Sequence, residues 1–410
     1  MKGILCCFGK ASANNVVQET AQPSEPPQQP QPTEPPQQPQ ATDSSVRVDD
    51  KNAEVNDEAP FGDNAFLNNA WIHNLQIPDS SANVYPSYPR LPADSGAPFA
   101  WRQIVNGTQN FRETNFLGRG NFGDVYRCNF PRIDKVGAVK IQKPSNEAGP
   151  HEFIAEVTTL RAANHLNVIK LLGTCYTRKN RVLVYEFMPK GSLDQYLFGA
   201  KTRQGQVLDW NTRIKIALGV ADGLKYLHIK RKTIHGDIKP GNILLDENFV
   251  PKLTDFGLAV KLVENEYGVE EQQSVISTNN TIKGTRGFIA PETEQLGLIS
   301  TMSDVYSFGV FLLVLFTGRK AYDVQRPPAT RKIIDWLKPV WNKTRSPSLV
   351  VDPALGTKYS KEGLNRLFSF GVKMCIDAQV EQRADMYCME MLIRQVEAFT
   401  VPEVPARHSL

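Results

Sequence analysis

The chain has 410 residues, of which 41% are hydrophobic and 22% charged, which is ample for a large buried core. This composition excludes fibrous and collagen-like proteins and small domains held together by disulfides. The first 100 residues carry 5 Lys+Arg and 12 Asp+Glu, and the other 310 carry 42 and 31, so an acidic leader precedes a basic body. The longest basic run is Lys230-Arg231-Lys232, which is too short to indicate nucleic acid, and we expect no such partner.

Residues 1–20 form a candidate lipid anchor. Cys6 and Cys7 are adjacent, have apolar neighbours and stand between Lys2 and Lys10, a pattern that fits S-palmitoylation. Two acyl chains bind a membrane stably, whereas one gives only marginal binding. The alternative is an unmodified terminus. The cysteines lack the spacing of a zinc site, and no apolar run approaches the roughly 20 residues of a membrane span. We therefore expect the chain to lie on the cytoplasmic side of the plasma membrane or else in the cytosol.

The composition of residues 21–100 predicts a disordered, polar leader. Residues 21–40 contain eight prolines and seven glutamines, and the sequence EPPQQPQ occurs twice, beginning at Glu25 and at Glu34. Such a segment cannot bury enough apolar surface to fold, and its prolines favour extended polyproline II. We expect a spacer. The alternative is a ligand for proline-recognising domains, which would give the chain an adaptor role.

From residue 111 onward the pattern indicates an α+β domain with two lobes. Short β-branched and aromatic runs, bounded by Gly, Pro and Asn, are typical of an antiparallel sheet. One helical segment interrupts them, and after residue 191 helical patterns dominate. We therefore expect a small β lobe with its hinge at 111–188, a larger α-helical lobe at 189–400, and a short tail at 401–410. The expected strands are 116–129, 135–142, 169–176 and 181–187, and the expected helices are 151–163, 210–228, 302–317, 331–341, 361–377 and 384–399.

The first chemical motif is a glycine-rich segment. Residues 118–125 read GRGNFGDV, which matches G-x-G-x-x-G-x-V. Glycines let a backbone approach phosphate groups without obstruction by Cβ atoms, with N–H groups directed at the anion. A dinucleotide-binding turn uses similar glycines but opens a helix. Here the β-like pattern continues through Cys128, so a hairpin is the better interpretation.

Further motifs follow in a fixed order along the chain. A strand lysine is followed by a glutamate on the isolated helix, then by two short loops rich in Asp and Asn. Carboxylate and amide oxygens at this spacing can bind a phosphate-bound divalent cation and accept a proton. The remaining motifs are Ala138-Val139-Lys140, Glu156, HGDIKPGN at 235–242, DFG at 255–257, APE at 290–292, SDVYSFG at 303–309, and Arg383.

Taken together, these motifs resemble the signature set of eukaryotic protein kinases over about residues 111–399. The phrases LVYEFM at 183–188 and GLKYLH at 223–228 resemble plant receptor-like kinases. With no membrane span, the chain resembles the receptor-like cytoplasmic branch. The resemblance implies a serine/threonine kinase that uses ATP with Mg²⁺ or Mn²⁺ and phosphorylates proteins near plasma-membrane receptors.

The resemblance also implies roles for individual residues. Asp237 would accept the proton of the substrate hydroxyl, and Lys239 would neutralise the γ-phosphate, as in Ser/Thr-specific kinases. Lys140, held by Glu156, would bind the α- and β-phosphates. The metal ligands would be Asn242 and Asp255. The ATP-contacting residues would be Leu117, Gly118, Gly120, Gly123, Val125, Ala138, Lys140, Tyr185, Glu186, Met188 and Leu244.

Five further residues resemble structural positions of the family. His235 and Phe256 would belong to an apolar stack that aligns the lobes. Asp304 would brace the catalytic loop, and Glu292 and Arg383 would pair in the large lobe. Ordinary core packing is compatible with each of these roles.

Position 236 departs from the family pattern. Many kinases have Arg immediately before the catalytic aspartate, where it pairs with a phosphorylated activation loop, and this chain has Gly. We therefore expect activity that depends less on phosphorylation of that loop than it does in kinases with the arginine. The candidate phosphorylation sites are Ser274, Ser277, Thr278, Thr281 and Thr285, of which Thr285 could instead be a hydrogen-bonding partner of Asp237. The competing function is a pseudokinase scaffold, which the intact catalytic residues disfavour.

Overall fold

The computed structural model describes residues 99–120, 123–131, 134–142, 149–176, 181–262, 276–277, 283–344, 346–377 and 379–399. These residues all lie in one compact unit, Trp71–Leu410, and a second unit, Met1–Ala70, lies outside the described residues. The proposed anchor with Cys6 and Cys7, the leader to residue 98 and the tail from residue 401 also lie outside them. In the described part of the chain, no helix is long and apolar enough to cross a bilayer.

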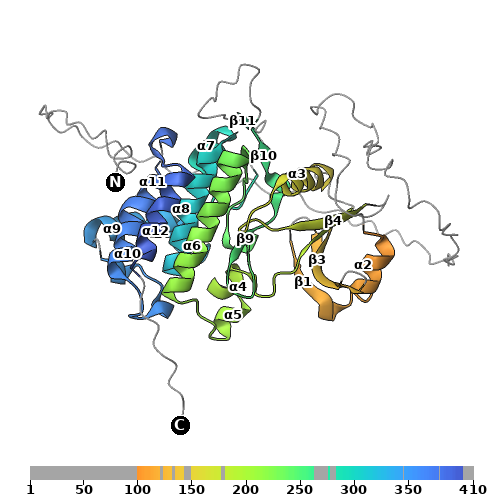
Figure 1. Ribbon diagram of the computed structural model, residues 1–410. Coiled ribbons are helices and arrows are strands. Elements are labelled where there is room, and N and C mark those ends of the chain that lie inside the picture. Colours follow the sequence, from red (N-terminus) through yellow and green to blue (C-terminus); the bar gives the residue numbers. More distant parts are fainter. Residues whose placement is uncertain are drawn as a thin grey trace, which may run out of the picture. The chain divides into compact units, whose positions relative to one another are not determined.

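The smaller lobe is built on a five-stranded antiparallel sheet, as the sequence predicts (Figure 1). The strand order is β1-β2-β3-β5-β4, and every pairing is antiparallel. The strands are β1 (Phe116–Arg119), β2 (Gly123–Phe130), β3 (Lys135–Gln142), β4 (Leu171–Tyr176) and β5 (Arg181–Glu186).

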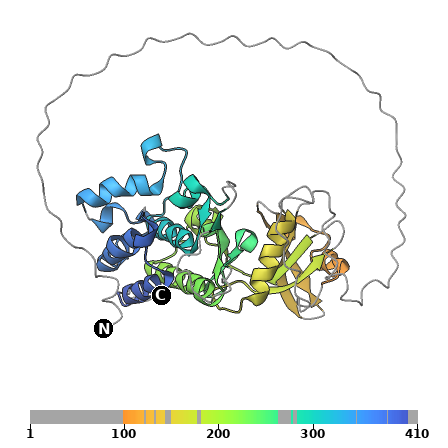
Figure 2. The same ribbon diagram turned by 90° about the horizontal axis from the view of Figure 1, so that it is seen from above.

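Each face of this sheet is covered by a different helix. Side chains alternate along a strand, so Val182 and Val184 of β5 pack in one apolar cluster, and Leu183 and Tyr185 pack in the other. The first cluster includes Ile104 of α2 (Trp101–Gly107), and the second includes side chains of α3 (Gly149–Ala162). Figures 1 and 2 show the two helices on opposite sides of the strands.

Helix α2 was not predicted from the sequence. Its Ile104 side chain is fully buried, and the Thr108 hydroxyl donates to the Ile104 carbonyl at 2.8 Å at the end of the helix. A Cβ atom on Gly107 would lie 2.4 Å from the Asn129 carbonyl oxygen and 2.5 Å from the Cys128 sulfur. Only glycine therefore allows the helix to lie this close to strand β2.

The larger lobe is mainly helical, with short strands beside the lobe boundary. One three-stranded sheet has the strand order β6-β8-β9. Its strand β6 follows the hinge segment, β8 follows the HGDIKPGN motif, and β9 precedes the DFG motif. The helices are α4 (Asp194–Leu197), α5 (Ala200–Arg203), α6 (Trp210–Lys225), α7 (Pro291–Leu296), α8 (Thr301–Thr317), α9 (Ile333–Thr344), α10 (Lys361–Arg366), α11 (Lys373–Cys375) and α12 (Met386–Glu397). The strands are β6 (Gly191–Ser192), β7 (Thr233–Ile234), β8 (Ile243–Leu245), β9 (Pro251–Leu253), β10 (Val260–Lys261), β11 (Ile276–Ser277) and β12 (Leu298–Ile299).

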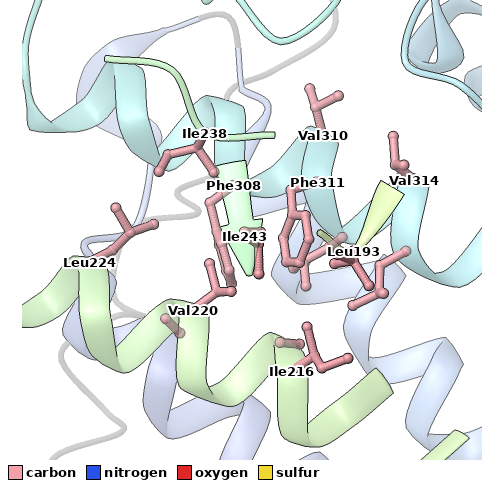
Figure 3. Packing of buried hydrophobic residues seen from close by; sticks show 14 of the residues in the cluster. Leu193, Ile216, Val220, Leu224, Ile238, Ile243, Phe308, Val310, Phe311 and Val314 are labelled. Carbon is pink, nitrogen blue, oxygen red and sulfur yellow. The ribbon is translucent and has the colours of Figure 1, made fainter. Parts of the chain in front are cut away.

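Helix α8 forms the centre of this lobe. Every residue from Ser303 to Thr317 is buried, as expected for a helix that is apolar on all sides and has neighbours around its whole circumference. Figure 3 shows Phe308 and Phe311 of α8 packed among Ile238 and Ile243 and the α6 side chain Val220. The Ser300 hydroxyl accepts from the Met302 N–H at 3.1 Å and caps the start of the helix.

Two of the expected helices are interrupted by wider turns. The expected helix 361–377 consists of α10, a π-helical turn η10 (Leu367–Val372) and α11. The expected helix 210–228 consists of α6 followed by a second π-helical turn, η4 (Tyr226–Lys230). A π turn changes which residues face the core without ending the helix, and apolar periodicity does not resolve it. The short 3-10 turns are η2 (Glu113–Asn115), η5 (Pro240–Asn242), η6 (Phe256–Leu258), η7 (Pro328–Thr330), η8 (Pro347–Leu349), η9 (Pro353–Leu355) and η11 (Val380–Gln382).

Candidate active site

Lys140 forms the centre of the candidate site. Strand alternation places it on the face of β3 opposite Val139, toward α3. Its Nζ atom lies 2.9 Å from Glu156 Oε2 and 2.7 Å from Asp255 Oδ1. Burial opposes the charge on Lys140, but the two carboxylates outweigh this effect and raise its pKa above the ordinary value. The ammonium group therefore stays protonated and joins β3, α3 and the DFG loop.

Glu156 has a second buried partner, which the motifs did not predict. The Tyr185 hydroxyl donates to Glu156 Oε1 at 2.6 Å, from the strand β5 next to β3. Burial and then the nearby Glu156 charge raise the pKa of Tyr185 well above its ordinary value, so the phenol remains a donor. Glu156 thus accepts from both neighbouring strands, which fixes the rotation of α3 against the sheet.

The predicted ATP-contacting residues of the sheet share one face. Val125 is the cross-strand partner of Lys140, and Ala138 is the partner of Tyr185, so all four side chains project to the same side. At the hairpin tip, the Gly120 N–H donates to the Gly123 carbonyl at 2.9 Å.

The other predicted ATP-contacting residues border this face. Leu117 and Gly118 lie on β1, and Leu117 is 48% exposed. Glu186 ends β5, and the buried Met188 follows it. Leu244 lies on β8, packed against the large core cluster.

Asp255 has a backbone conformation that is unusual for a residue with a side chain. Its φ is +65°, in the left-handed region, which costs energy and persists only where the surrounding structure requires it. Burial disfavours its charge, but Lys140 outweighs burial and lowers the pKa of Asp255 below the ordinary value. The next residue, Phe256, packs against His235 with ring centroids 4.7 Å apart, and so joins the DFG loop to the catalytic loop.

Asp237 lies at the centre of a compact hydrogen-bond network. Its carboxylate accepts from Lys239 Nζ at 2.6 Å, from Thr285 Oγ1 at 2.7 Å and from Asn242 Nδ2 at 2.9 Å. Lys239 Nζ also donates to Thr285 Oγ1 at 2.7 Å. The structure contains the hydrogen bond between Thr285 and Asp237, and phosphorylation of Thr285 stays a prediction. These three donors fix the position of the carboxylate.

Asn242 and Asp255 are brought together by the β8–β9 hairpin. Asn242 immediately precedes β8, Asp255 follows β9, and the Thr254 N–H donates to the Asn242 carbonyl at 3.0 Å. Within the described ranges, no group of three or more His, Cys, Asp or Glu side chains could hold a metal ion. One carboxylate and one amide oxygen suit a hard cation whose other ligands are phosphate oxygens and water, so the donor set fits Mg²⁺ or Mn²⁺.

Asp304 holds the backbone of the catalytic loop by hydrogen bonds. Its carboxylate accepts from the backbone N–H groups of His235 at 2.7 Å and Gly236 at 2.9 Å, and it lies 2.9 Å from His228 Nε2. Burial disfavours its charge, but the hydrogen bond with His228 and the neighbouring histidines outweigh burial and lower the pKa of Asp304. The contact with His228 was not predicted, since nothing in the motif sequence indicates it.

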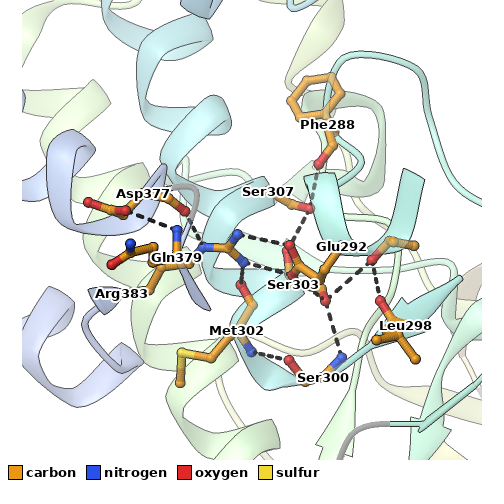
Figure 4. Close-up of polar contacts among 11 residues, drawn as sticks. Phe288, Glu292, Leu298, Ser300, Met302, Ser303, Ser307, Asp377, Gln379 and Arg383 are labelled. Atoms are coloured by element: carbon orange, nitrogen blue, oxygen red, sulfur yellow. Dashed lines mark hydrogen bonds and ion pairs between the residues drawn. The ribbon is translucent and has the colours of Figure 1, made fainter. Parts of the chain in front are cut away.

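Glu292 and Arg383 form the predicted pair in the large lobe (Figure 4). Arg383 donates two hydrogen bonds to the Glu292 carboxylate, at 2.8 and 2.9 Å, and others to the carbonyls of Met302 and Asp377. Ser303 Oγ also donates to Glu292 at 3.0 Å. Because Glu292 lies in the first turn of α7, this bidentate pair fixes the end of the activation segment to α8 and to the chain before α12.

The activation segment is described only in part. Ser274, Thr278 and Thr281 lie outside the described residues, and only the backbone of Ser277 is described, in β11. Near its end, Lys283 Nζ lies 3.7 Å from Glu152 of α3, a contact that was not predicted. A cavity of about 30 Å³ lies beneath this part, lined by residues that include Gly236, Asp237 and Thr285. A cavity of this size can hold a water molecule.

Comparison with known proteins identifies the family. Residues 111–362 match the model of the protein kinase domain. The chain belongs to the protein kinase family. Protein kinases bind ATP and protein substrates and use a divalent metal, so the convergence of Lys140, Asp237 and Asp255 agrees with the family.

Among the relatives of this kinase are three from plants. "Probable serine/threonine-protein kinase PBL21" of Arabidopsis thaliana is 39% identical over 297 residues, covering 72% of this chain and 74% of the relative. "Serine/threonine-protein kinase PBS1" of the same species is 40% identical, covering 70% of this chain and 61% of the relative. "EPD1-interacting receptor-like cytoplasmic serine/threonine-protein kinase 5D" of Gossypium barbadense is also 40% identical, covering 70% and 62%.

The Glu292–Arg383 pair predicts a pH-dependent stability. Burial disfavours the Glu292 charge, but the hydrogen bonds from Arg383 outweigh burial and hold the pKa of Glu292 below its ordinary value of 4.5. A lowered pKa stabilises the fold above pH 4.5, and this contribution is lost as the pH falls. Glu292→Gln should lower the free energy of unfolding by about 2 kcal/mol at pH 7, as expected for the loss of hydrogen bonds to a charged group, and the loss should shrink below pH 4.5. Urea denaturation at several pH values measures it.

The matched control is Glu362→Gln, which removes an exposed pair with Arg366 on α10. An exposed i,i+4 pair contributes about 0.5 kcal/mol or less, so the control should unfold almost as the wild type does. A stability difference between Glu292→Gln and the wild type that stayed constant from pH 7 to pH 4 would contradict the assigned ion pair.

Proposed function

We propose that this chain is a Ser/Thr protein kinase that transfers the γ-phosphate of Mg-ATP to hydroxyl groups of proteins. The observation that carries the proposal is the network around Asp237, where Lys239, Thr285 and Asn242 surround one carboxylate. The names of the plant relatives support Ser/Thr specificity, and so does Lys239 two residues after Asp237.

In this proposal the substrate hydroxyl approaches Asp237. The carboxylate orients the hydroxyl and accepts its proton as the oxygen–phosphorus bond forms and the bond to the ADP oxygen breaks. Lys239 lies 2.6 Å from the same carboxylate, where its charge would stabilise the transferring phosphoryl group. Little covalent chemistry is left to the protein, so the position of these charges determines the rate.

The remaining polar residues of the site would hold the nucleotide. Lys140 would bind the α- and β-phosphates while Glu156 keeps it in place, and Asn242 and Asp255 would bind Mg²⁺ or Mn²⁺. Bound metal would neutralise part of the negative charge of the phosphates. The predicted adenine contacts are Val125 and Ala138 on the sheet side and Leu244 on the other lobe.

Replacing the proposed proton acceptor tests the function. Asp237→Asn should lower the transfer of radiolabelled phosphate to a generic protein substrate by about 10²–10⁴-fold, the usual contribution of a positioned acid or base. Hydrolysis of the protein substrate labelled by the wild-type enzyme should give labelled Ser or Thr and little labelled Tyr. The control is Asp335→Asn, the same change at an exposed position of α9, which should keep the wild-type rate. Equal labelling by wild type and Asp237→Asn would favour a pseudokinase scaffold.

We also propose that activity depends little on phosphorylation of the activation segment. Gly236 offers no cation to receive a phosphate, and Lys239 and Thr285 already hold Asp237 in place. Treatment with a protein phosphatase, followed by its removal, should leave most of the transfer rate. The measurement is the initial rate on an exogenous substrate, with mass spectrometry to verify dephosphorylation. A near-total loss of rate that ATP pre-incubation restores would contradict the proposal.

The proposed location is the cytoplasmic face of the plasma membrane, near receptor kinases. The support is the Cys6-Cys7 pair in the sequence and the name of the Gossypium barbadense relative, a receptor-like cytoplasmic kinase. A Cys6→Ser/Cys7→Ser variant of a fluorescent fusion should move from the membrane to the cytosol, because both acyl sites are lost. The single variants are the controls and should show intermediate binding. Unchanged membrane signal in the double variant would defeat the lipid proposal and leave the cytosolic alternative.

A further inference from the structure

An exposed arginine lies beside the network that holds Asp237. Arg286 directly follows Thr285, whose hydroxyl donates to the Asp237 carboxylate at 2.7 Å. The Arg286 guanidinium lies 3.9 Å from the centre of the Tyr322 ring. Stacking on an aromatic face limits the motion of a guanidinium and leaves its edge free for hydrogen bonds. Arg286 is thus held in place on Tyr322, one residue along the chain from the Thr285 that contacts Asp237.

The ring under Arg286 belongs to a strongly basic loop. Residues 319–332, here called the basic loop, contain five Lys or Arg and one Asp. The Arg319 guanidinium lies 3.8 Å from the centre of the Trp336 ring. Burial and then repulsion by Arg326 lower the pKa of Arg319, so these two cations are close enough to repel each other. Two aromatic rings therefore support a concentrated positive charge.

Only part of this charge is neutralised by the protein. Arg326 pairs with Asp323 at 3.2 Å, and Lys332 pairs with Glu294 at 2.9 Å. Among the described residues, no carboxylate forms an ion pair with the other cations, which are Arg286, Arg319, Lys320 and Arg331. Unpaired cations on a surface raise the local potential and attract acidic groups.

The basic loop is held in one shape by its own backbone. The Asp323 N–H donates to the Arg331 carbonyl at 3.0 Å, and the Ile333 N–H donates to the Ala321 carbonyl at 2.9 Å. A Cβ atom on Gly287 would lie 2.9 Å from the Ala321 carbonyl carbon, so the activation segment lies directly against the base of the loop. Its cations are therefore preorganised, and binding a ligand costs little ordering entropy.

We propose that Arg286 and the basic loop select protein substrates with acidic residues close to the phosphorylated Ser or Thr. An extended peptide advances about 3.3 Å per residue, so side chains one to three positions from a hydroxyl at Asp237 reach Arg286 and its neighbours. Glutamate and aspartate carboxylates match the guanidinium fork, and lysine or arginine there would be repelled. This inference rests on the proposed kinase function and specifies its substrate class.

The test uses the full-length kinase with Mg-ATP and a set of peptides that share one acceptor Ser. Glu, Gln or Lys is placed singly at each of the three positions before and after the acceptor. We expect at least one position where Glu exceeds Gln in kcat/KM by about fivefold, as one favourable exposed ion pair would give, and where Lys falls below Gln. The gain should lie mainly in KM and should fade toward about 0.5 M salt, because exposed charges are screened.

Variants assign the preference to the named residues. Arg286→Glu should reverse the preference, so that kcat/KM is higher for Lys peptides than for Glu peptides. Lys320→Gln, at an exposed site, should weaken the preference for Glu. The measured quantity is the ratio of kcat/KM values, which is independent of the amount of active enzyme. Lys361→Gln is the matched control, because it removes an exposed cation of α10 and should leave the ratio unchanged.

The outcomes separate this inference from the proposed function. Transfer to all peptides with equal efficiency, or with a preference for Lys, would overturn the inference and leave the kinase function intact. A Glu preference that persists unchanged in Arg286→Glu would also overturn it. No transfer to any peptide or to a generic protein would overturn the kinase function and the inference together.

Discussion

One buried ammonium group joins the two lobes of this kinase. Lys140 on β3 contacts Glu156 on α3 and Asp255 after β9, so three elements distant in sequence share one cation. Removing any member leaves a buried charge without its partner, which is far more costly than losing an exposed pair. The three groups also carry a net negative charge, which is an electrostatic reason for the site to accept a divalent cation bound to phosphate.

A second buried charge gives the catalytic loop its rigidity. Asp304 lies in the buried part of helix α8 and accepts from two consecutive backbone N–H groups of the loop. Backbone donors cannot change rotamer, so Asp237 is positioned by main-chain geometry and then by Lys239 and Thr285. Rigid anchors behind a reacting group keep a site preorganised for charge that develops during reaction. The Glu292–Arg383 pair extends the same support to the end of the activation segment.

The motifs predicted the residues whose chemistry requires one amino-acid type at one place. Lys140, Asp237, Asn242 and Asp255 were named from the sequence, and the structure pairs Lys140 with Asp255 and Asn242 with Asp237. Contacts between side chains of different motifs were missed, because they depend on which elements become neighbours in the fold. The Tyr185 hydroxyl is an example, since nothing local shows that strand β5 lies within reach of Glu156. Helix α2 was missed for another reason: seven residues carry too little periodicity, and packing rather than intrinsic propensity stabilises it.

Helix α2 also affects where the folded domain can be cut. The family match begins at residue 111, ten residues after α2 begins at Trp101. A recombinant fragment started at the match would lack Ile104 and leave the outer face of the sheet, with Cys128 and Val184, open to water. Uncovered apolar faces of sheets promote aggregation, so expression and drug-screening fragments of this enzyme should start before Phe99.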